Sequence, residues 1–262
     1  MRNLLPAGLI AIALLIPSAG AQTSPANPEI IANGSLLHSL LAKPVVGQPY
    51  SAVQVHTTKR QLADGTNITH SGHHFVARDA SGRVRVEMRL AEATDSKAET
   101  ILVFVADPEA RTVTTWMTGS KVNKLATVAK MKDEKSTTKP VPTPVHQDTR
   151  PQPIVTTEDL GYDTLQGVSV SVAKTTTIVP AGRSGNDAPI TKTHELWTSP
   201  DMKLVLKEQW EDPRSGERTL SLEKFSRAAP DPGLFHPPAD YKVQDVVQTL
   251  KDLEEKLNAT QN

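Results

Sequence analysis

The densest group of side chains that could do chemistry is the run His70-Ser71-Gly72-His73-His74. Imidazole nitrogens are common metal ligands and general bases. On an extended strand, however, His70 and His74 lie on one face and His73 lies on the other, because successive side chains alternate. A zinc site needs three or four ligands, so this run supplies too few nitrogens. We therefore predict solvated strand histidines here and no metal site.

Two further patterns suggest catalysis but have the wrong geometry for it. His194 and Glu195 are neighbours on a predicted strand, so they point to opposite faces and are badly placed as a base and its orienter. The S-x-x-K pattern of serine acyltransferases occurs at Ser171–Lys174 and Ser221–Lys224. That chemistry needs Ser and Lys on one helical turn, whereas both copies lie in strand-like runs. The sequence also has no G-x-S-x-G, no phosphate-binding glycine loop and no H-E-x-x-H. We predict no catalytic residue, no cofactor and no enzyme activity.

Ser171, His194 and Ser221 belong to the second half of the chain, which is predicted to contain four strand-like runs between Asp159 and Val243. Turn residues bound the runs: Gln166-Gly167, Pro180–Pro189, Ser199-Pro200-Asp201 and Asp212–Gly216. Proline presets φ at the second position of a turn and glycine accepts positive φ, so these segments are predicted to turn. The result is an antiparallel meander.

The first half has the same character. Five strands are predicted before Thr118: Tyr50–Leu62, Asn67–Arg78, Arg83–Leu90, Ile101–Ala106 and Arg111–Met117. Between Arg83 and Leu90 apolar and charged residues alternate, which is typical of a half-buried strand with one wet face. The fold class is therefore mainly β, a curved, half-barrel-like antiparallel sheet.

Alternation in the two halves predicts one apolar face that could bind a ligand. Its members are Val84, Val86, Met88, Leu90, Val170, Leu220 and Leu222, with Val168 and Val172 beside Val170. A C-terminal amphipathic helix over Val243–Leu257 is the expected cover, with Leu234-Phe235 plugging an apolar socket at the sheet edge. About 15 helical residues span roughly 22 Å, which is too short for about nine strands spaced about 4.8 Å apart. The uncovered remainder is predicted to be a groove for an acyl chain or an apolar peptide.

Composition and the N-terminus indicate the compartment. Arg2 precedes the apolar run Leu4–Ile16, and Ala19-Gly20-Ala21 supplies small residues, which together predict a signal peptide cleaved before Gln22. The apolar run is too short for a spanning helix, so the mature protein is not expected to be transmembrane. The sequence has no cysteine and thus no disulfide, which is ordinary for an exported bacterial protein. Charges balance at 29 basic and 29 acidic side chains, so we expect no nucleic-acid partner.

The predicted organisation has six segments. These are a signal peptide (1–21), an N-terminal segment (22–48), the first half of the sheet (49–118), a disordered Lys-, Thr- and Pro-rich insert (119–157), the second half of the sheet (158–241), and the C-terminal helix and tail (242–262). The insert contains Lys139–Pro144 and Pro151-Gln152-Pro153, whose alternating prolines favour extended polyproline II. It is either a surface excursion between the two halves, a spacer, or a ligand for a proline-binding groove.

The turns and the segment after the last strand resemble a group of uncharacterised exported bacterial proteins. The markers are Val179–Gly182, Gly185–Ile190, Glu195–Asp201, Asp212–Glu217, Pro230–Phe235 and Pro238–Tyr241, with Leu62–Gly65 and Asp79–Arg83 in the first half. At a greater distance the run of hairpins is similar to the LolA/LolB/RseB-like half-barrels of the bacterial envelope. That resemblance implies an open, curved sheet with helical cover on its concave face. It also implies a protein that holds or senses acyl chains or lipoproteins.

Two functions remain open at this stage. The first is a non-catalytic envelope protein, periplasmic or secreted, that binds a lipid or another apolar ligand. The alternative is a structural or regulatory module of the periplasm that binds an envelope protein or a lipoprotein through the proline segment or the C-terminal helix. A continuous apolar cavity would favour the first function, because ligand sites are concave and mostly apolar. An exposed apolar stripe would favour the second.

Overall fold

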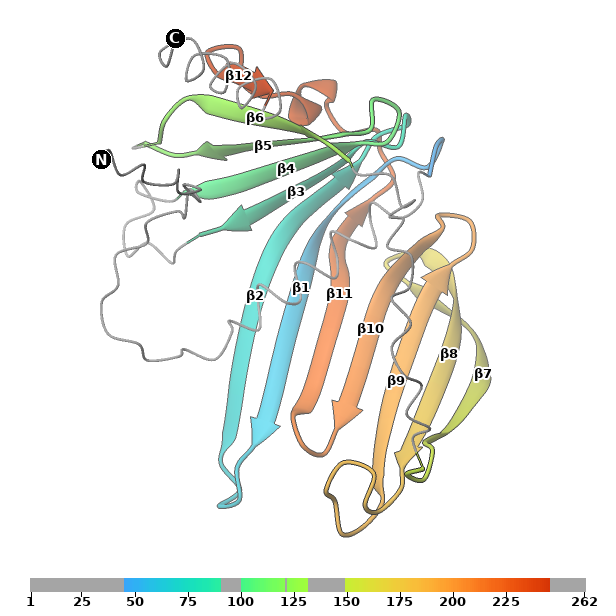
Figure 1. The fold of residues 1–262 in the computed structure, drawn as a ribbon. Helices are drawn as coiled ribbons and strands as arrows, with labels where there is room; N and C mark the ends of the chain where they lie inside the picture. The colour runs from blue at the N-terminus through green and yellow to red at the C-terminus, as the bar shows by residue number, and fades with distance from the viewer. Residues whose placement is uncertain (1–44, 91–99, 121, 132–148, 246–262) are drawn as a thin grey trace, which may run out of the picture. The chain divides into compact units, whose positions relative to one another are not determined.

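The computed structural model describes residues 45–90, 100–120, 122–131 and 149–245, all within the compact unit Ser39–Asn262 (Figure 1). These residues form one mainly antiparallel sheet of twelve strands. The described part of the chain contains no α-helix and one short 3-10 helix. The signal peptide (1–21), the insert residues 132–148 and residues 246–262 of the predicted C-terminal helix lie outside the described residues.

The strands follow one another along the chain with few crossovers. They are β1 (Tyr50–Gln61), β2 (Asn67–Arg78), β3 (Val84–Arg89), β4 (Ile101–Asp107), β5 (Thr112–Thr118), β6 (Leu125–Lys130), β7 (Ile154–Leu165), β8 (Val168–Val179), β9 (Ile190–Ser199), β10 (Leu204–Asp212), β11 (Gly216–Ser226), and β12 (Lys242–Asp245) after the 3-10 helix η2 (Pro232–Phe235). Their order in the sheet is β12-β6-β5-β4-β3-β2-β1-β11-β10-β9-β8-β7. The two predicted meanders are therefore present, and the β1–β11 pair joins them.

Bulges interrupt three of the pairings. The extra residue lies in β11 between Glu223 and Ser226, opposite Ser51–Val53 of β1, in β7 between Asp159 and Gly161, and in β10 between Val205 and Lys207. An extra residue in one strand of an antiparallel pair bends that strand and increases its twist. We therefore expect the sheet to bend locally at these three positions.

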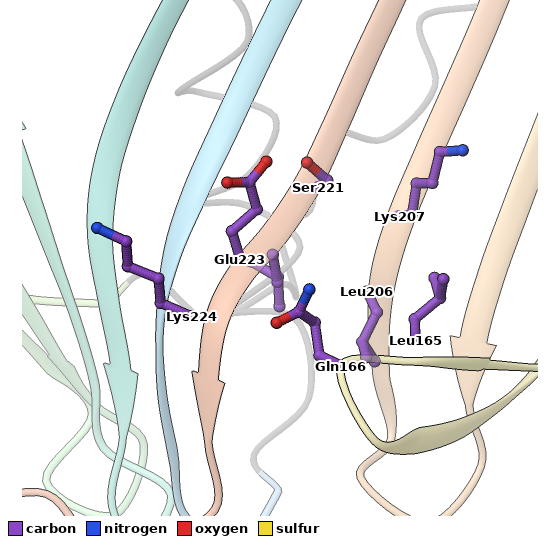
Figure 2. Close-up of a pocket in the computed structure, with 8 residues that line it drawn as sticks. Leu165, Gln166, Leu206, Lys207, Ser221, Glu223 and Lys224 are labelled. Carbon is purple, nitrogen blue, oxygen red and sulfur yellow. The ribbon is translucent and has the colours of Figure 1, made fainter.

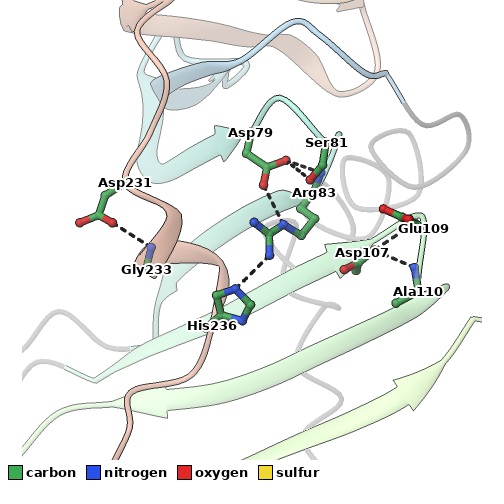
Figure 3. Close-up of polar contacts among 9 residues, drawn as sticks. All are labelled: Asp79, Ser81, Arg83, Asp107, Glu109, Ala110, Asp231, Gly233 and His236. Atoms are coloured by element: carbon green, nitrogen blue, oxygen red, sulfur yellow. Dashed lines mark hydrogen bonds and ion pairs between the residues drawn. The ribbon is translucent and has the colours of Figure 1, made fainter.

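Short acidic turns set the hairpins of the first half. The Asp64 carboxylate accepts a hydrogen bond from the Thr66 amide at 2.9 Å, and Gly65 adopts φ +87° between them. Asp107 accepts from the amides of Glu109 and Ala110 at 2.9 and 2.8 Å, which closes the β4–β5 turn (Figure 3). Both turns lie between strands that the sequence predicts, and they suit their residues, because Asp bonds the following backbone and Gly permits positive φ.

The core of the first half lies under the segment that follows β11. Phe235 of η2 is buried against one face of the sheet. The cluster comprises Ala77, Val103, Val105, Trp116, Ala126 and Phe235, with Phe75, Ile101, Leu234 and Tyr241 packed around it. The predicted plug formed by Leu234-Phe235 is thus confirmed, and its partners lie on β2, β4, β5 and β6.

Two arginines of β3 and the preceding turn fasten this plug. The Arg83 guanidinium lies 5.2 Å above the Phe235 ring and 3.0 Å from His236 Nε2, and it is held by Asp79 at 2.7 Å (Figure 3). Arg85 donates to the Leu234 carbonyl. Burial opposes ionisation of Asp79, but hydrogen bonds from Ser81 and Arg83 outweigh it and hold its pKa below the usual range. The plug is thus fixed by charge-assisted contacts as well as by packing.

At the end of the β1–β2 pair where Tyr50 lies opposite Arg78, the Arg78 cation is buried beside the Tyr50 phenol. Arg78 donates to the carbonyls of Gln48 (2.8 Å) and Met202 (2.7 Å), and its guanidinium lies 4.9 Å from the Tyr50 ring centre. Tyr50 also stacks on Phe225 at 5.4 Å. Burial raises the pKa of Tyr50 to about 12, although the nearby Arg78 charge lowers it.

This buried phenol predicts a pH effect on stability. Between about pH 10 and about pH 12 the unfolded chain loses the Tyr50 proton while the folded protein keeps it, so stability falls as pH rises. The decline is at most about 1.4 kcal/mol per pH unit. Tyr50→Phe should show a shallower decline when the free energy of unfolding in urea is measured across this window. Tyr162→Phe, at an exposed position, should keep the wild-type slope. Parallel curves for Tyr50→Phe and wild type would contradict the buried phenol.

Three boundaries differ from the sequence expectation. Lys242–Asp245 is strand β12, paired in parallel with β6, so the predicted helix does not begin at Val243. The β-branched Val243 suits the strand, and the Lys242 amide donates to the Lys124 carbonyl at 2.9 Å. Within the predicted insert, residues 125–130 form β6 and β7 begins at Ile154. The sheet therefore has twelve strands and not about nine.

Candidate functional site

The register shows which of the predicted face residues share a face. Val86 pairs with Val76 and Val76 pairs with Ala52, while Gln54 pairs with Leu222. Directly opposed residues of an antiparallel pair lie on one face, and so do residues two apart on a strand. The face that carries Val86 therefore includes Val84, Met88, Leu220 and Leu222.

Val170 lies on the opposite face from Leu222. Its neighbour Val172 pairs with Trp197, Trp197 with Lys207, and Lys207 with Ser221. Ser221 lies between Leu220 and Leu222 on β11, so its side chain points away from theirs. The expectation that Val168, Val170 and Val172 continue the Leu220–Leu222 face is therefore wrong. Alternation was read correctly within each strand, but the relation between strands depends on register.

The predicted face residues also differ in burial. Val84, Val86, Val170 and Leu222 are buried, Met88 and Leu220 are half-buried, and Leu90 is 51% exposed beyond the end of β3. Side chains already buried by the protein leave little surface for a ligand to cover. Most of this set is core.

A pocket of about 550 Å³ lies where the β7–β8 turn meets β10 and β11 (Figure 2). Its lining residues are Leu165, Gln166, Leu206, Lys207, Ser221, Leu222, Glu223 and Lys224. Leu165 is the last residue of β7, Gln166 belongs to the β7–β8 turn, Leu206 and Lys207 belong to β10, and the others belong to β11. Leu222 is the member of the predicted face that contributes to it.

The lining combines three apolar residues with five polar ones, and the Leu222 side chain points to the face opposite that of Ser221 and Lys207. Leu206 and Leu222 are buried and Leu165 is half-buried, so the apolar part belongs to the body of the sheet. Lys207 places its Nζ 4.1 Å from the Trp197 ring centre, which holds this ammonium in place. Lys224 contributes a second positive charge and Glu223 a negative one, so the lining carries a net positive charge.

The backbone at this pocket is unusual. Gln166 and Lys224 have φ of 51° and 49°, in the left-handed region that side chains other than glycine rarely adopt. Such conformations cost on the order of 1–3 kcal/mol and persist where the surrounding structure imposes them. At Lys224 the turned backbone breaks the alternation of β11, and this is why Ser221, Glu223 and Lys224 all reach the same pocket.

The S-x-x-K expectation needs a partial correction here. Ser221 and Lys224 were predicted to point opposite ways, yet both line the pocket. A Ser–Lys catalytic pair requires Oγ and Nζ within hydrogen-bond reach. No hydrogen bond between these two side chains occurs in the described part of the chain, and the pair carries no catalytic assignment.

The histidine run is divided between solvent and core. His70 and His73 are exposed as predicted. His74 is 6% exposed and stacks on His56 at 5.4 Å, so the expectation of solvation is wrong for it. It faces the same side as Gln54, with which it pairs, and that side of β1 is buried. Among the residues that the structure describes, no group of three or more His, Asp or Glu could hold a metal.

His194 and Glu195 have separate partners. His194 Nε2 lies 3.1 Å from Glu208, and its ring stacks on Trp210 at 4.9 Å. Glu195 pairs with Lys174 at 2.8 Å on the other face. The two neighbouring side chains therefore have separate partners and point to opposite faces of β9, as the alternation of the strand predicts. Trp210 in turn stacks under Arg218, whose Cζ lies 3.9 Å from the ring centre.

No family model and no curated protein sequence matches this chain. Solved structures match at low identity. An uncharacterised conserved protein from Thermus thermophilus is 13% identical with a TM-score of 0.38, covering 81% of this chain and 99% of that one. MucB in the Pseudomonas aeruginosa MucA/MucB complex is 16% identical with a TM-score of 0.37, covering 82% of this chain and 64% of that one. The Mycobacterium tuberculosis lipoprotein LppX is 12% identical with a TM-score of 0.27, covering 78% and 99%.

MucB is an RseB-like protein, so the matches include a protein of the kind that the sequence resembles at a distance. Scores of this size transfer no ligand or residue role to this chain. Among the described residues, no helix is long and apolar enough to cross a membrane.

Proposed function

We propose that this protein holds the apolar part of an amphipathic ligand, such as a lipid acyl chain, in the pocket between the β7–β8 turn and strands β10 and β11, without transforming it chemically. The observation that carries the proposal is the pocket of about 550 Å³ itself, which is lined by Leu165, Leu206 and Leu222 together with polar and charged residues. The proposal includes the export of the protein to the periplasm or the cell exterior, on the evidence of its N-terminal sequence.

The size and chemistry of the pocket suit such a ligand. Ligand pockets usually measure about 300–1,000 Å³ and combine apolar walls with a few polar groups that fix orientation. A volume of about 550 Å³ lies within that range. Covering apolar wall contributes about 25 cal/mol per Å². Lys207 and Lys224 can pair with an anionic headgroup, while Gln166 and Ser221 offer hydrogen bonds.

The seven-residue face predicted from the sequence stays a broader hypothesis for the same function. Leu222 belongs to both sets of residues. Met88 and Leu220 share its face and are half-buried, so they could extend a binding surface along the sheet. Val84 and Val86 pack in the core of that face and are expected to act through folding.

Leu165→Arg tests the proposal. Leu165 is half-buried at the strand end, so the longer charged side chain can fill the pocket without disrupting the sheet. We expect the dissociation constant for the uncharged hydrophobic dye Nile red to rise at least about tenfold, equivalent to about 1.4 kcal/mol. Leu62→Arg, at an exposed leucine of the β1–β2 turn, is the matched control and should leave it unchanged.

Thermal unfolding of both variants checks that the sheet remains folded. Equal dye binding by wild type and a folded Leu165→Arg protein would reject the pocket as the site. Failure of the wild-type protein to bind dye would reject the proposed function itself.

A further inference from the structure

Strand β7 forms a long, open edge of the sheet. It has twelve residues, and all but two of them are exposed. Within the described residues β7 pairs with β8 and with no other strand (Figure 1, right border). The opposite edge, β12, has only four residues. An edge strand presents a row of backbone N–H and C=O groups to which another strand can bond, so the two edges differ greatly in capacity.

The usual protections of an edge are weak here. Proteins commonly shield edge strands with lysines, prolines, bulges or a covering element. The sequence of β7 contains neither lysine nor proline. Among the described residues, its protections are its acidic side chains and the bulge between Asp159 and Gly161, where the Asp159 carboxylate accepts from the Gly161 amide at 2.9 Å. The bulge leaves Ile154–Asp159 as the longer regular stretch.

This stretch has an apolar end and an acidic end. Ile154 and Val155 are 59% and 61% exposed, and Glu158 and Asp159 follow after two threonines. The nearest cation on β8 is Lys174, which pairs across from Glu158 but places its Nζ 2.8 Å from Glu195 on β9. The acidic end is therefore open to a further positive charge.

We propose that Ile154–Asp159 is a docking edge for an extended segment of another protein, which adds antiparallel to β7. The complementary segment has Lys or Arg at its N-terminal end, opposite Asp159 and Glu158, and apolar side chains at its C-terminal end, opposite Val155 and Ile154. Main-chain hydrogen bonds supply affinity in this mode of recognition and the alternate side chains supply specificity. The inference is independent of the pocket.

A second copy of this chain is a poorer occupant. Two antiparallel β7 strands centred on Thr156 and Thr157 would set Glu158 against Val155 and Asp159 against Ile154. Each carboxylate would then lose water against an apolar side chain without gaining a cation, which is costly. A basic strand removes this mismatch.

The probe is a blocked hexapeptide, Lys-Lys-Thr-Thr-Val-Ile, measured by fluorescence polarisation on the intact protein. We expect it to bind at least about tenfold more tightly than Glu-Glu-Thr-Thr-Val-Ile, since like charges across an interface cost several kcal/mol. Glu158→Lys should weaken binding of the basic peptide by about tenfold. Glu109→Lys, at an exposed acid of the β4–β5 turn, should leave it unchanged.

Two further measurements separate strand addition from simple charge attraction. Methylation of alternate peptide nitrogens should abolish binding, and hydrogen exchange of the β7 amides should slow when the unmodified peptide binds. Equal binding of the methylated peptide would overturn the proposal, as would equal effects of the two lysine substitutions or no binding at all. Dimerisation of the protein through β7 would also overturn it, because the occupant would then be a second copy.

Discussion

Phe235→Ala is expected to lower the free energy of unfolding by about 3–5 kcal/mol, the usual cost of removing a buried phenylalanine side chain. Phe235 is 3% exposed and packs on a surface that includes small and β-branched residues beside Trp116. These neighbours, Ala77, Val103 and Val105 among them, lie on paired strands and cannot collapse into the space. Arg83 would also lose the ring beneath its guanidinium.

Chemical denaturation followed by tryptophan fluorescence measures this effect, because Trp116 belongs to the same cluster. Tyr162→Ala is the matched control, since it removes an aromatic ring that is 81% exposed. Its effect should stay within about 0.5 kcal/mol, as for other surface substitutions. A loss below about 1 kcal/mol for Phe235→Ala would mean that η2 does not plug the sheet.

The hairpins could be predicted because their causes are local. Asp64-Gly65 and Asp107-Pro108 carry the turn chemistry within a few residues, and alternation at Val84, Val86 and Met88 marks the strand that follows. The same reasoning located Leu234-Phe235 as a plug, since a short apolar pair between prolines has to be buried somewhere. The main-chain architecture of both meanders follows from such signals.

The pairing between distant segments was not predictable in the same way. Nothing local joins β1 to β11 or sets β12 in parallel beside β6. The sequence does not predict β6, because its six residues lie in a Lys- and Thr-rich context that is typical of a loop. β12 lies in a segment predicted to be helical because Val243, Val246 and Val247 recur at helical spacing, and short apolar runs are ambiguous between helix and strand.

The candidate site depends on these distant relations. Gln166-Gly167 was identified as a turn, but the sequence gives no reason for that turn to lie against β10 and β11. The face of Val170 relative to Leu222 depends on three successive registers across the sheet. Lys224 joins the pocket through a positive φ, and lysine gives no signal of that conformation. The alternation of apolar and polar residues along each strand therefore cannot by itself predict a binding surface that is assembled from several strands.

Gly216→Ala should be strongly destabilising, by roughly 2–5 kcal/mol. Gly216 has φ +88° where the β10–β11 turn enters β11, and the left-handed region costs a residue with a Cβ about 1–2 kcal/mol. A Cβ at this position would also overlap the Lys59 carbonyl oxygen and lie 3.0 Å from Arg60 Cα. Both atoms are backbone, so they cannot rotate away, and overpacking of this kind adds about 1–3 kcal/mol. The damage falls on the β1–β11 pair, which joins the two halves of the sheet.

Gly185→Ala separates the two causes. Gly185 lies between β8 and β9 with φ +79°, and a Cβ there would meet nothing within 4 Å. This variant has only the cost of the left-handed conformation, so its free energy of unfolding, measured by urea denaturation, should fall by about 1–2 kcal/mol. The difference between the two variants then measures the close approach of the β10–β11 turn to β1. If the two losses were equal, Gly216 would be needed only for its conformation, and the tight contact with Lys59 and Arg60 would be wrong.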